Sequence, residues 1–246
     1  MEKRKRCIVY HAYCQKRYAK MAAQSAKSAK RAMPDVATVL LTELPMKPGW
    51  FDEVIEVQPV PLVRAHLPPL SVLPGQYESG IYLDCDSYVC KPLYDVFELV
   101  EDTKIDIALV HTSGKRRDRR YPSPDIPEAY PHWRSAFIAF QHNDRVKEFF
   151  AEWDRAFHEH LKTYRKVSKI EGPCHPDQMS MRIALYHSNV SIATLPANYC
   201  TTLGAIVIRG TVRVIAAEGD MEKLAKEANR GAPQARFFHR GKGVKI

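Results

Sequence analysis

The sequence predicts an α/β fold in which helices flank a parallel β-sheet on both faces. Short apolar runs alternate in the first half of the chain with longer segments of helical period, an order that is typical of parallel sheets. Of the 246 residues, 45% are hydrophobic, enough to build one sizeable core. No internal repeat, low-complexity tract or linker interrupts the sequence, so we expect a single domain over 1–246.

The first half predicts a series of strands and one long helix. RCIVYHA, 6–12, is an apolar run suited to a buried first strand. Apolar residues from Tyr18 to Met33 then recur at helical spacing, with lysines and arginines on the other faces, which predicts an amphipathic helix. Pro34 ends this helix, because the residue before a proline disfavours helical backbone. The further predicted strands are 37–43, 52–59, 81–86 and 104–111, and the proline-rich segment 59–74 is expected to contain a short helix at 63–66.

The second half is less regular. Segment 112–131 is rich in proline and basic residues and is expected to form a long loop, of a length that is usually functional. Apolar residues from Val146 to Leu161 predict an amphipathic helix, and Pro176 and Asp177 mark the start of another that extends to 187. The remaining segments are predicted strands at 132–141, 190–199 and 205–216, followed by a closing segment at 237–246.

Two aspartates stand one residue apart at the end of the apolar run IYLDCD. On a strand, the side chains of Asp84 and Asp86 would leave on one side and that of Cys85 on the other. Two carboxylates this close repel each other unless a cation lies between them. Ligands of such sheets bind beyond the carboxyl ends of the strands, where His11 and Tyr13 end the first strand. The pattern therefore predicts a cation site that shares a crevice with the end of the first strand.

The charge of the chain favours an anionic partner. Its formal net charge is +9, and GKRRDRR, 114–120, concentrates basic residues in the predicted loop. Such a cluster attracts nucleotide phosphates, nucleic acid or an acidic membrane surface. The six cysteines form no CxxC pair and are expected to be reduced. No signal peptide or membrane-spanning run is apparent, so the expectation is a cytoplasmic protein without a transmembrane segment.

The order of these motifs resembles the nucleotide-sugar glycosyltransferases of the GT-A fold, especially the glycogenin and lipopolysaccharide galactosyltransferase type. The resemblance runs from Ile8 to the C-terminus. Its segments are HAYCQKRYAKMAAQSAKSAKR (11–31), IYLDCDSYVCKPL (81–93), WRSAFIAFQHNDRVKEFFAEWDRAF (133–157), HPDQMSMRIAL (175–185) and HRGKGVK (239–245).

This resemblance implies a Rossmann-like GT-A domain with a mixed, mostly parallel sheet flanked by helices. It would comprise a nucleotide-binding half, about 1–111, and an acceptor and closing half, about 112–246. The implied activity is a hexosyltransferase-like, metal-dependent transfer of a sugar from a nucleotide diphosphate donor, usually a UDP-sugar, with retention. The acceptor stays open. A hydroxylated DNA base or a membrane-linked glycan, met through the 114–120 loop, would suit the positive charge.

The resemblance also implies which residues hold the metal. Asp86 would be the principal ligand, Asp84 would be shared between the metal and the nucleotide ribose, and His239 would add a nitrogen ligand. Mn²⁺ and Mg²⁺ prefer oxygen ligands and bridge phosphates, and imidazole favours Mn²⁺. Lys245, or Lys242, would add a positive charge at the diphosphate.

Further residues would contact the donor. The resemblance implies that Asp177 and Gln178 reach the donor sugar and the reaction centre; the alternative for Asp177 is a helix cap. The family has asparagine, a small residue and glycine where this chain has Arg134-Ser135-Ala136. Arg134 would either meet an acidic group or alter sugar recognition. The expected nucleotide contacts are His11, Tyr13, Tyr18 and Arg64.

Two other functions compete with sugar transfer. LDCDSYV also fits the DxDx(T/V) motif of haloacid-dehalogenase-like phosphatases, in which Asp84 would be the nucleophile. That motif belongs on the first strand, whereas several predicted strands precede Asp84 here. A catalytically inactive GT-A domain that binds nucleic acid through its basic loop is the other alternative.

Overall fold

The computed structural model describes residues 5–13, 16–45, 47–58, 73, 75–102, 104–112, 125–171, 176–202, 206–217, 219–239 and 243–245. Within these ranges, the side chains of 160–171, 176, 206, 238–239 and 243–245 are outside the description. The predicted short helix at 63–66 and the basic cluster at 114–120 therefore lie outside the described residues, as does most of the predicted loop.

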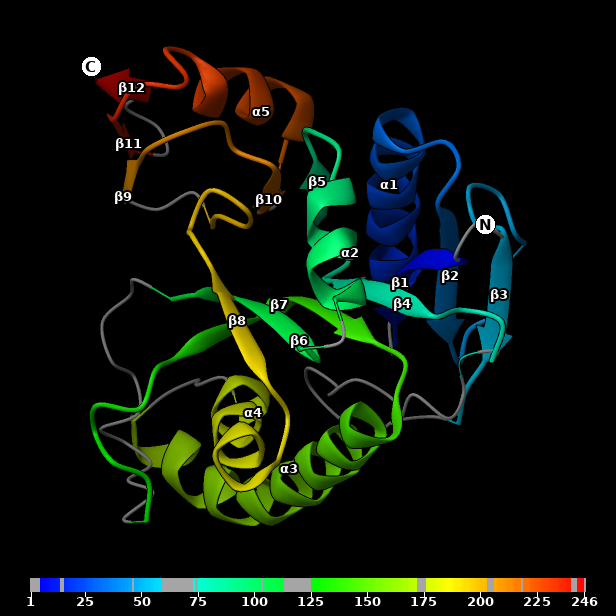
Figure 1. The fold of residues 1–246 in the computed structure, drawn as a ribbon, viewed down its shortest axis with the longest axis vertical. Coiled ribbons are helices and arrows are strands. Elements are labelled where there is room, and N and C mark those ends of the chain that lie inside the picture. The colour runs from blue at the N-terminus through cyan, green and yellow to red at the C-terminus, as the bar shows by residue number, and fades with distance from the viewer. Residues whose placement is uncertain are drawn as a thin grey trace.

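A seven-stranded sheet runs through the molecule (Figure 1). In spatial order its strands are β3 (Glu53–Glu56), β2 (Ala37–Thr42), β1 (Arg6–Ala12), β4 (Ser79–Leu83), β7 (Trp133–Gln141), β6 (Ile107–His111) and β8 (Ile192–Leu195). The first four are parallel to one another, β7 is antiparallel to both β4 and β6, and β6 is parallel to β8. The sheet is therefore mixed and mostly parallel, which confirms the predicted fold class.

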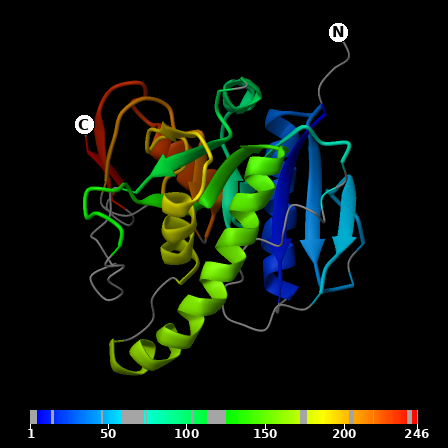
Figure 2. The ribbon, with the colours of Figure 1, turned by 60° about the horizontal axis from the view of Figure 1, so that its bottom comes forward.

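Helices cover both faces of the sheet (Figures 1 and 2). α1 (Lys16–Ala32) and α2 (Tyr94–Glu101) pack on one face. α3 (Asp144–Glu171) and α4 (Pro176–His187) lie side by side on the other. Each face of the sheet thus has its own hydrophobic core.

Strand β1 shows why both faces must be covered. Ile8 and Tyr10 belong to the core beneath α1 and α2, whereas Cys7 and Val9 belong to the core beneath α3 and α4. Alternate residues of a strand point to opposite faces. A run that is apolar at every position is therefore stable only as a central strand with helices on both sides. This explains why the sequence RCIVYHA indicates a central strand of the sheet.

The C-terminal region adds two small sheets beside α1 and α2 (Figure 1). β5 (Ser87–Val89) pairs with β10 (Val214–Ala216), directly after the two aspartates. α5 (Met221–Asn229) follows, and the other small sheet consists of β9 (Ile206–Ile208), β11 (Arg236–His239) and β12 (Gly243–Lys245). The carboxyl-terminal third of the chain therefore returns to the edge of the sheet where the aspartates lie.

Hydrogen bonds from α1 fix the segment after the aspartates. The hydroxyl of Ser25 donates to the phenol oxygen of Tyr10 at 3.1 Å. The hydroxyl of Ser28 accepts from the amide of Val89 at 2.9 Å. These serines lie on the buried face of α1, so the helix is tied both to β1 and to β5.

Candidate active site

A cleft of about 370 Å³ opens at the carboxyl ends of β1 and β4. Because these strands are parallel and β7 is antiparallel to β4, the start of β7 lies at the same edge as the ends of the other two. The register pairs Leu83 with Phe137, so residues 134–136 come beside the aspartates. The residues that line the cleft are His11, Tyr13, Arg17, Tyr18, Met21, Tyr82, Asp84, Cys85, Asp86, Arg134, Ser135, Ala136, Asp177, Gln178, Thr202 and Ala216.

The two aspartates stand on a turn. Strand β4 ends at Leu83, and the amide of Asp84 donates to the carbonyl of Ala136 at 3.1 Å. The amide of Ser87 then donates to the carbonyl of Asp84 at 3.0 Å, which closes the turn. The expectation that the strand continues through Asp86 was therefore wrong. Both carboxylates nevertheless line the one cleft, because the turn, rather than strand alternation, brings them together.

Neighbouring groups hold this turn in place. The hydroxyl of Tyr82 donates to Oδ1 of Asp84 at 3.1 Å, and the thiol of Cys85 donates to the carbonyl of His11 at 3.1 Å. The amide of Ala217 donates to the carbonyl of Asp86 at 3.0 Å. The aspartate turn is thus bonded to β1 and to the segment after β10.

Asp84 and Asp86 affect the pKa of two neighbouring thiols. Burial raises the pKa of the Cys85 thiol, and Asp84 and Asp86 raise it further. Burial likewise raises the pKa of Cys200 to about 12; Arg134 lowers it and the same two aspartates raise it. Carboxylates that oppose ionisation of their neighbours favour a bound cation.

Aromatic rings form the other wall of the cleft. The rings of Tyr13 and Tyr18 are stacked, with centroids 5.5 Å apart and an interplanar angle of 24°. His11, whose exposed fraction is 2%, lies 5.3 Å from the ring of Tyr13. The guanidinium of Arg17 lies 4.9 Å from the ring of Tyr18 and donates to its hydroxyl at 3.1 Å. The predicted residues His11, Tyr13 and Tyr18 therefore lie close together, and the guanidinium of Arg17 lies beside Tyr18.

Asp177 and Gln178 reach the cleft from the first turn of α4. The hydroxyl of Ser135 donates to Oδ2 of Asp177 at 2.8 Å, and the side-chain amide of Gln178 donates to the carbonyl of Trp133 at 2.9 Å. Oδ1 of Asp177 is buried and has no hydrogen-bond partner among the described residues. The carboxylate is thus held by β7.

The other predicted residues are not tested by the geometry. His239 ends β11 and Lys245 ends β12, but their side chains lie outside the description. Arg64 and Lys242 lie outside the described residues altogether. Within the described part of the chain, no group of three or more His, Cys, Asp or Glu side chains is arranged to hold a metal ion. The roles of His239, Lys245, Arg64 and Lys242 remain predictions.

Among the cleft residues that were not predicted are Arg17, Tyr82 and Thr202. Arg17 and Tyr82 lie beside predicted residues in the sequence and could have been found from that proximity. Thr202 lies in no motif that was singled out, and only the return of the chain through β10 brings it to the cleft.

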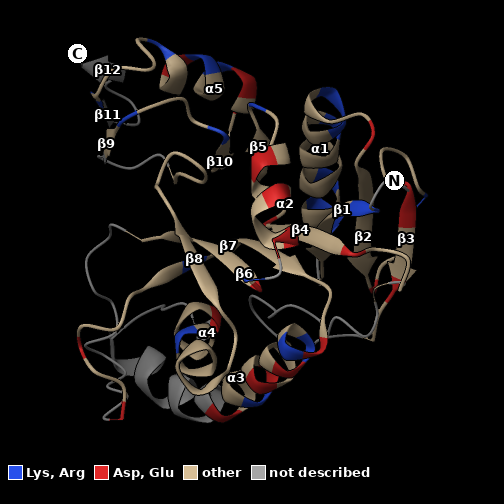
Figure 3. Ribbon diagram, in the orientation of Figure 1, with Lys and Arg blue, Asp and Glu red and all other residues tan. Residues whose placement is uncertain are grey.

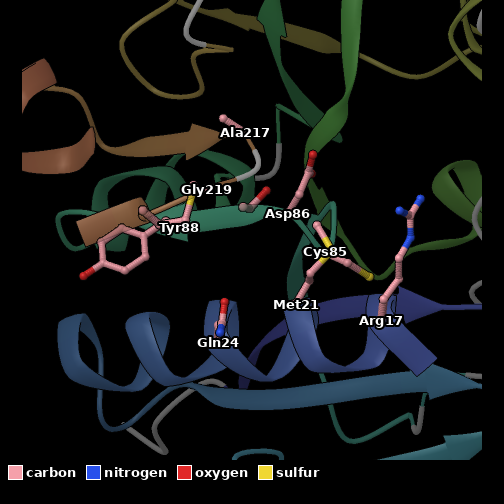
Figure 4. Close-up of a pocket in the computed structure, with 10 residues that line it drawn as sticks. Arg17, Met21, Gln24, Cys85, Asp86, Tyr88, Ala217 and Gly219 are labelled. Carbon is pink, nitrogen blue, oxygen red and sulfur yellow. The ribbon is translucent and has the colours of Figure 1, made fainter. Parts of the chain in front are cut away.

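A second hollow of about 220 Å³ adjoins the cleft along α1 (Figure 4). It shares Arg17, Met21, Cys85 and Asp86 with the cleft. Figure 4 shows Met21 and Gln24 of α1 on one side of this hollow, with Tyr88 and Gly219 across from them. The cleft therefore continues past the aspartate turn toward α5.

Charge is distributed unevenly around the cleft. Helix α1 contains six lysines and arginines and no acidic residue, and Figure 3 shows them along its length. Two of these cations, Lys16 and Arg17, stand in its first turn, where the helix dipole disfavours positive charge. An anion bound at this end of α1 would offset that cost.

Among the helices of the described chain, none is long and apolar enough to cross a membrane.

Solved structures of glycosyltransferases share this fold. The galactosyltransferase LgtC, solved with donor and acceptor sugar analogs, matches with a TM-score of 0.51 and 15% identity over 91% of this chain and 93% of that chain. Mouse xyloside xylosyltransferase 1 matches with a TM-score of 0.51 and 11% identity over 87% of this chain and 97% of that one. No family model and no curated protein matches the sequence. The chain has the GT-A glycosyltransferase-like fold that its motifs predict.

Proposed function

We propose that this protein is a glycosyltransferase that moves a sugar, in a hexosyltransferase-like reaction, from a nucleotide diphosphate donor to an acceptor. One observation carries the proposal: a single cleft of a GT-A-like fold gathers the aspartate pair, stacked tyrosines and the Asp177–Gln178 pair. We propose further that the whole chain, 1–246, is one such domain and that the donor carries uridine diphosphate.

The donor set of the cleft suits a hard divalent cation, Mn²⁺ or Mg²⁺. Asp84 and Asp86 supply carboxylate oxygens that line the cleft, and such cations take oxygen ligands. These residues would hold the metal, with His239 as the proposed nitrogen ligand. When bound, the metal would offset the negative charge that develops on the leaving diphosphate. Mg²⁺ is usually held by one or two carboxylates together with substrate phosphates, so a cation here would bind together with the nucleotide.

The chain's own residues would bind and orient the donor. Tyr13 and Tyr18 would contact the base with their rings, and His11 packs against Tyr13. Arg17, at the first turn of α1, would add positive charge near the phosphates, with Lys245 or Lys242 and Arg64 as further proposed cations. Electrostatic stabilisation of this kind acts most strongly when the groups are fixed before the reaction begins.

Asp177 and Gln178 would contact the transferred sugar near its anomeric carbon. The bond from Ser135 leaves one oxygen of Asp177 for the substrate. We propose retention of the anomeric configuration, on the likeness of the motifs, and proton NMR of the product would test it. The acceptor would be part of an anionic molecule, a hydroxylated base of DNA or a membrane-linked glycan, met through the basic 114–120 segment.

The decisive experiment is calorimetric titration with UDP, with and without Mn²⁺. Wild type should bind UDP more tightly with the metal, and Asp86→Ala should lose the metal-dependent part. Asp125→Ala, which changes an exposed aspartate outside the cleft, is the matched control and should bind as wild type does. An affinity for UDP that is the same with and without Mn²⁺, or no binding of UDP at all, would contradict the proposal. The phosphatase and nucleic-acid alternatives would then be tested next.

A further inference from the structure

Arg134 enters the cleft from the start of β7. Trp133 before it is buried in the core beneath α3 and α4, and Ser135 after it bonds to α4. Because side chains alternate along a strand, Arg134 lies on the other side, toward the returning C-terminal segment. There its Nη1 donates to the hydroxyl of Thr202 at 2.7 Å.

The guanidinium of Arg134 is incompletely satisfied. Its Nε is buried and has no hydrogen-bond partner among the described residues. Arg6, which is partly buried, pairs with the carboxylate of Glu101 at 2.7 Å, whereas the buried arginines Arg182 and Arg236 donate to backbone carbonyls. Within the described chain, the bond to Thr202 is the hydrogen bond of the Arg134 side chain. A guanidinium that lines a cleft and is hydrogen-bonded to a hydroxyl rather than to a carboxylate is suited to an anion that comes from outside.

The position of Arg134 indicates which part of a donor it would meet. The carbonyl of its neighbour Trp133 accepts from Gln178, and the hydroxyl of its neighbour Ser135 donates to Asp177. In the proposed function, those two α4 residues contact the transferred sugar. Arg134 is also near the aspartate turn, because Arg134, Asp84 and Asp86 all act on the thiol of Cys200. A sugar held between the diphosphate and Asp177 would therefore pass beside Arg134.

Charge and shape together identify the group. A bound cation would offset Asp84 and Asp86. The third carboxylate of the cleft, that of Asp177, accepts from Ser135 rather than from Arg134. The guanidinium presents a planar fork of donors that matches a carboxylate through two parallel hydrogen bonds. The hydroxyl of Thr202, which accepts from Arg134, is a further polar group beside the guanidinium.

We propose that Arg134 makes the site selective for a donor whose sugar carries a carboxylate, that is, a nucleoside diphosphate uronic acid. This inference rests on the proposed function and specifies its substrate class. Arg134 and Thr202 would bind the carboxylate at C6 of the sugar, while Asp177 and Gln178 would contact the ring.

The test compares donors that differ only at C6: UDP-glucuronate against UDP-glucose, and UDP-galacturonate against UDP-galactose. Each is titrated calorimetrically with Mn²⁺ present. Wild type should bind the uronate of at least one pair about tenfold more tightly than its neutral partner, which corresponds to about 1.4 kcal/mol. Arg134→Gln should abolish this preference but leave the affinity for UDP itself unchanged.

Two further variants sharpen the test. Arg134→Lys should keep only part of the preference, because an ammonium provides charge without the planar fork. Arg31→Gln, which removes an exposed arginine of α1 outside the cleft, should keep all of it. An unchanged affinity for UDP in every variant shows that the cleft is intact.

The outcomes separate the inference from the function on which it rests. If UDP binds with Mn²⁺ but wild type prefers the neutral sugars or does not discriminate, the uronate inference is overturned and the glycosyltransferase proposal stands. A preference that persists in Arg134→Gln overturns the role of Arg134. If neither UDP nor any of the four UDP-sugars binds, both proposals fall.

Discussion

Ser135 and Asp177 lie 42 residues apart in the sequence and are joined by a 2.8 Å hydrogen bond between the serine hydroxyl and Oδ2 of the carboxylate. This bond links the start of β7 to the first turn of α4. The indole of Trp153 supports the same turn from α3, since it donates to the carbonyl of Asp177 at 3.0 Å. One oxygen of Asp177 is thereby fixed, and the other is buried without a hydrogen-bond partner among the described residues.

Replacing Ser135 by alanine should reduce sugar transfer more than stability. The loss of one hydrogen bond to a carboxylate costs about 1.5–3 kcal/mol, and here much of it would appear as a misoriented Asp177. We expect kcat to fall by about tenfold, with little change in the KM for the donor. Ser135→Thr, which keeps the hydroxyl, is the control. A kcat equal to that of wild type in Ser135→Ala would show that Asp177 needs no such support.

Tyr13 should contribute to nucleotide affinity through its aromatic face. Tyr13→Ala should weaken UDP binding by about tenfold, since stacking of a base on an aromatic side chain contributes about 1–3 kcal/mol. Tyr13→Phe should bind nearly as wild type does, because the ring persists. Tyr186→Ala, on α4 and outside the cleft, serves as the matched control in calorimetry. Equal affinities of the alanine and wild-type proteins would exclude base stacking at Tyr13.

Asp106 should make the stability of the fold depend on pH at the acid end. The carboxylate is buried, and burial alone would raise its pKa, but hydrogen bonds from Arg145, Ser191 and Asn143 outweigh burial and lower the pKa to about 2. A carboxyl whose folded pKa lies below its unfolded value, about 3.9, stabilises the fold fully above the unfolded value. That contribution, about 2 kcal/mol, is lost as the pH falls from about 4 to about 2.

Urea unfolding between pH 5 and pH 2 would measure this effect. Asp106→Asn should be less stable than wild type at pH 6, by about 2 kcal/mol, because the buried side chain loses its charge-assisted hydrogen bonds. The difference between the two proteins should shrink as the pH falls. A difference that stays constant down to pH 2 would show that Asp106 does not titrate in this range.

Gly80 should not tolerate a side chain. A Cβ at this position of β4 would lie 2.4 Å from Cζ of Phe140, on the neighbouring strand β7. Because Phe140 is buried in the core, its ring cannot move aside without displacing other residues. Gly80→Ala should therefore destabilise the fold by about 1–3 kcal/mol, seen as a lower Tm. Pairing the change with Phe140→Leu should recover part of the loss, and if it does not, the clash is not the cause.

Much of the fold could be predicted from local patterns. The uninterrupted apolar runs of β1 and β2 identify central strands, and the predicted helix at 176–187 coincides with α4. The helices α2 and α5 were missed. They have eight and nine residues, and helices this short depend on packing rather than on their own propensity. In α5 a local signal was present, because Asp220 caps the helix by accepting from the amide of Lys223.

The sequence by itself determined the chemistry available to the cleft: the aspartate pair, the tyrosines after β1 and the Asp-Gln start of α4. Whether these residues meet was decided only by the tertiary structure. The antiparallel entry of β7 brings Arg134 and Ser135 beside the aspartate turn, and the return of the chain through β10 brings Thr202 to the same place. Hydrophobic periodicity is a local property that fixes which residues a strand or helix turns inward. The register of strands far apart in the chain is set by how both cores pack, so the neighbours of Arg134 could be found only in the folded molecule.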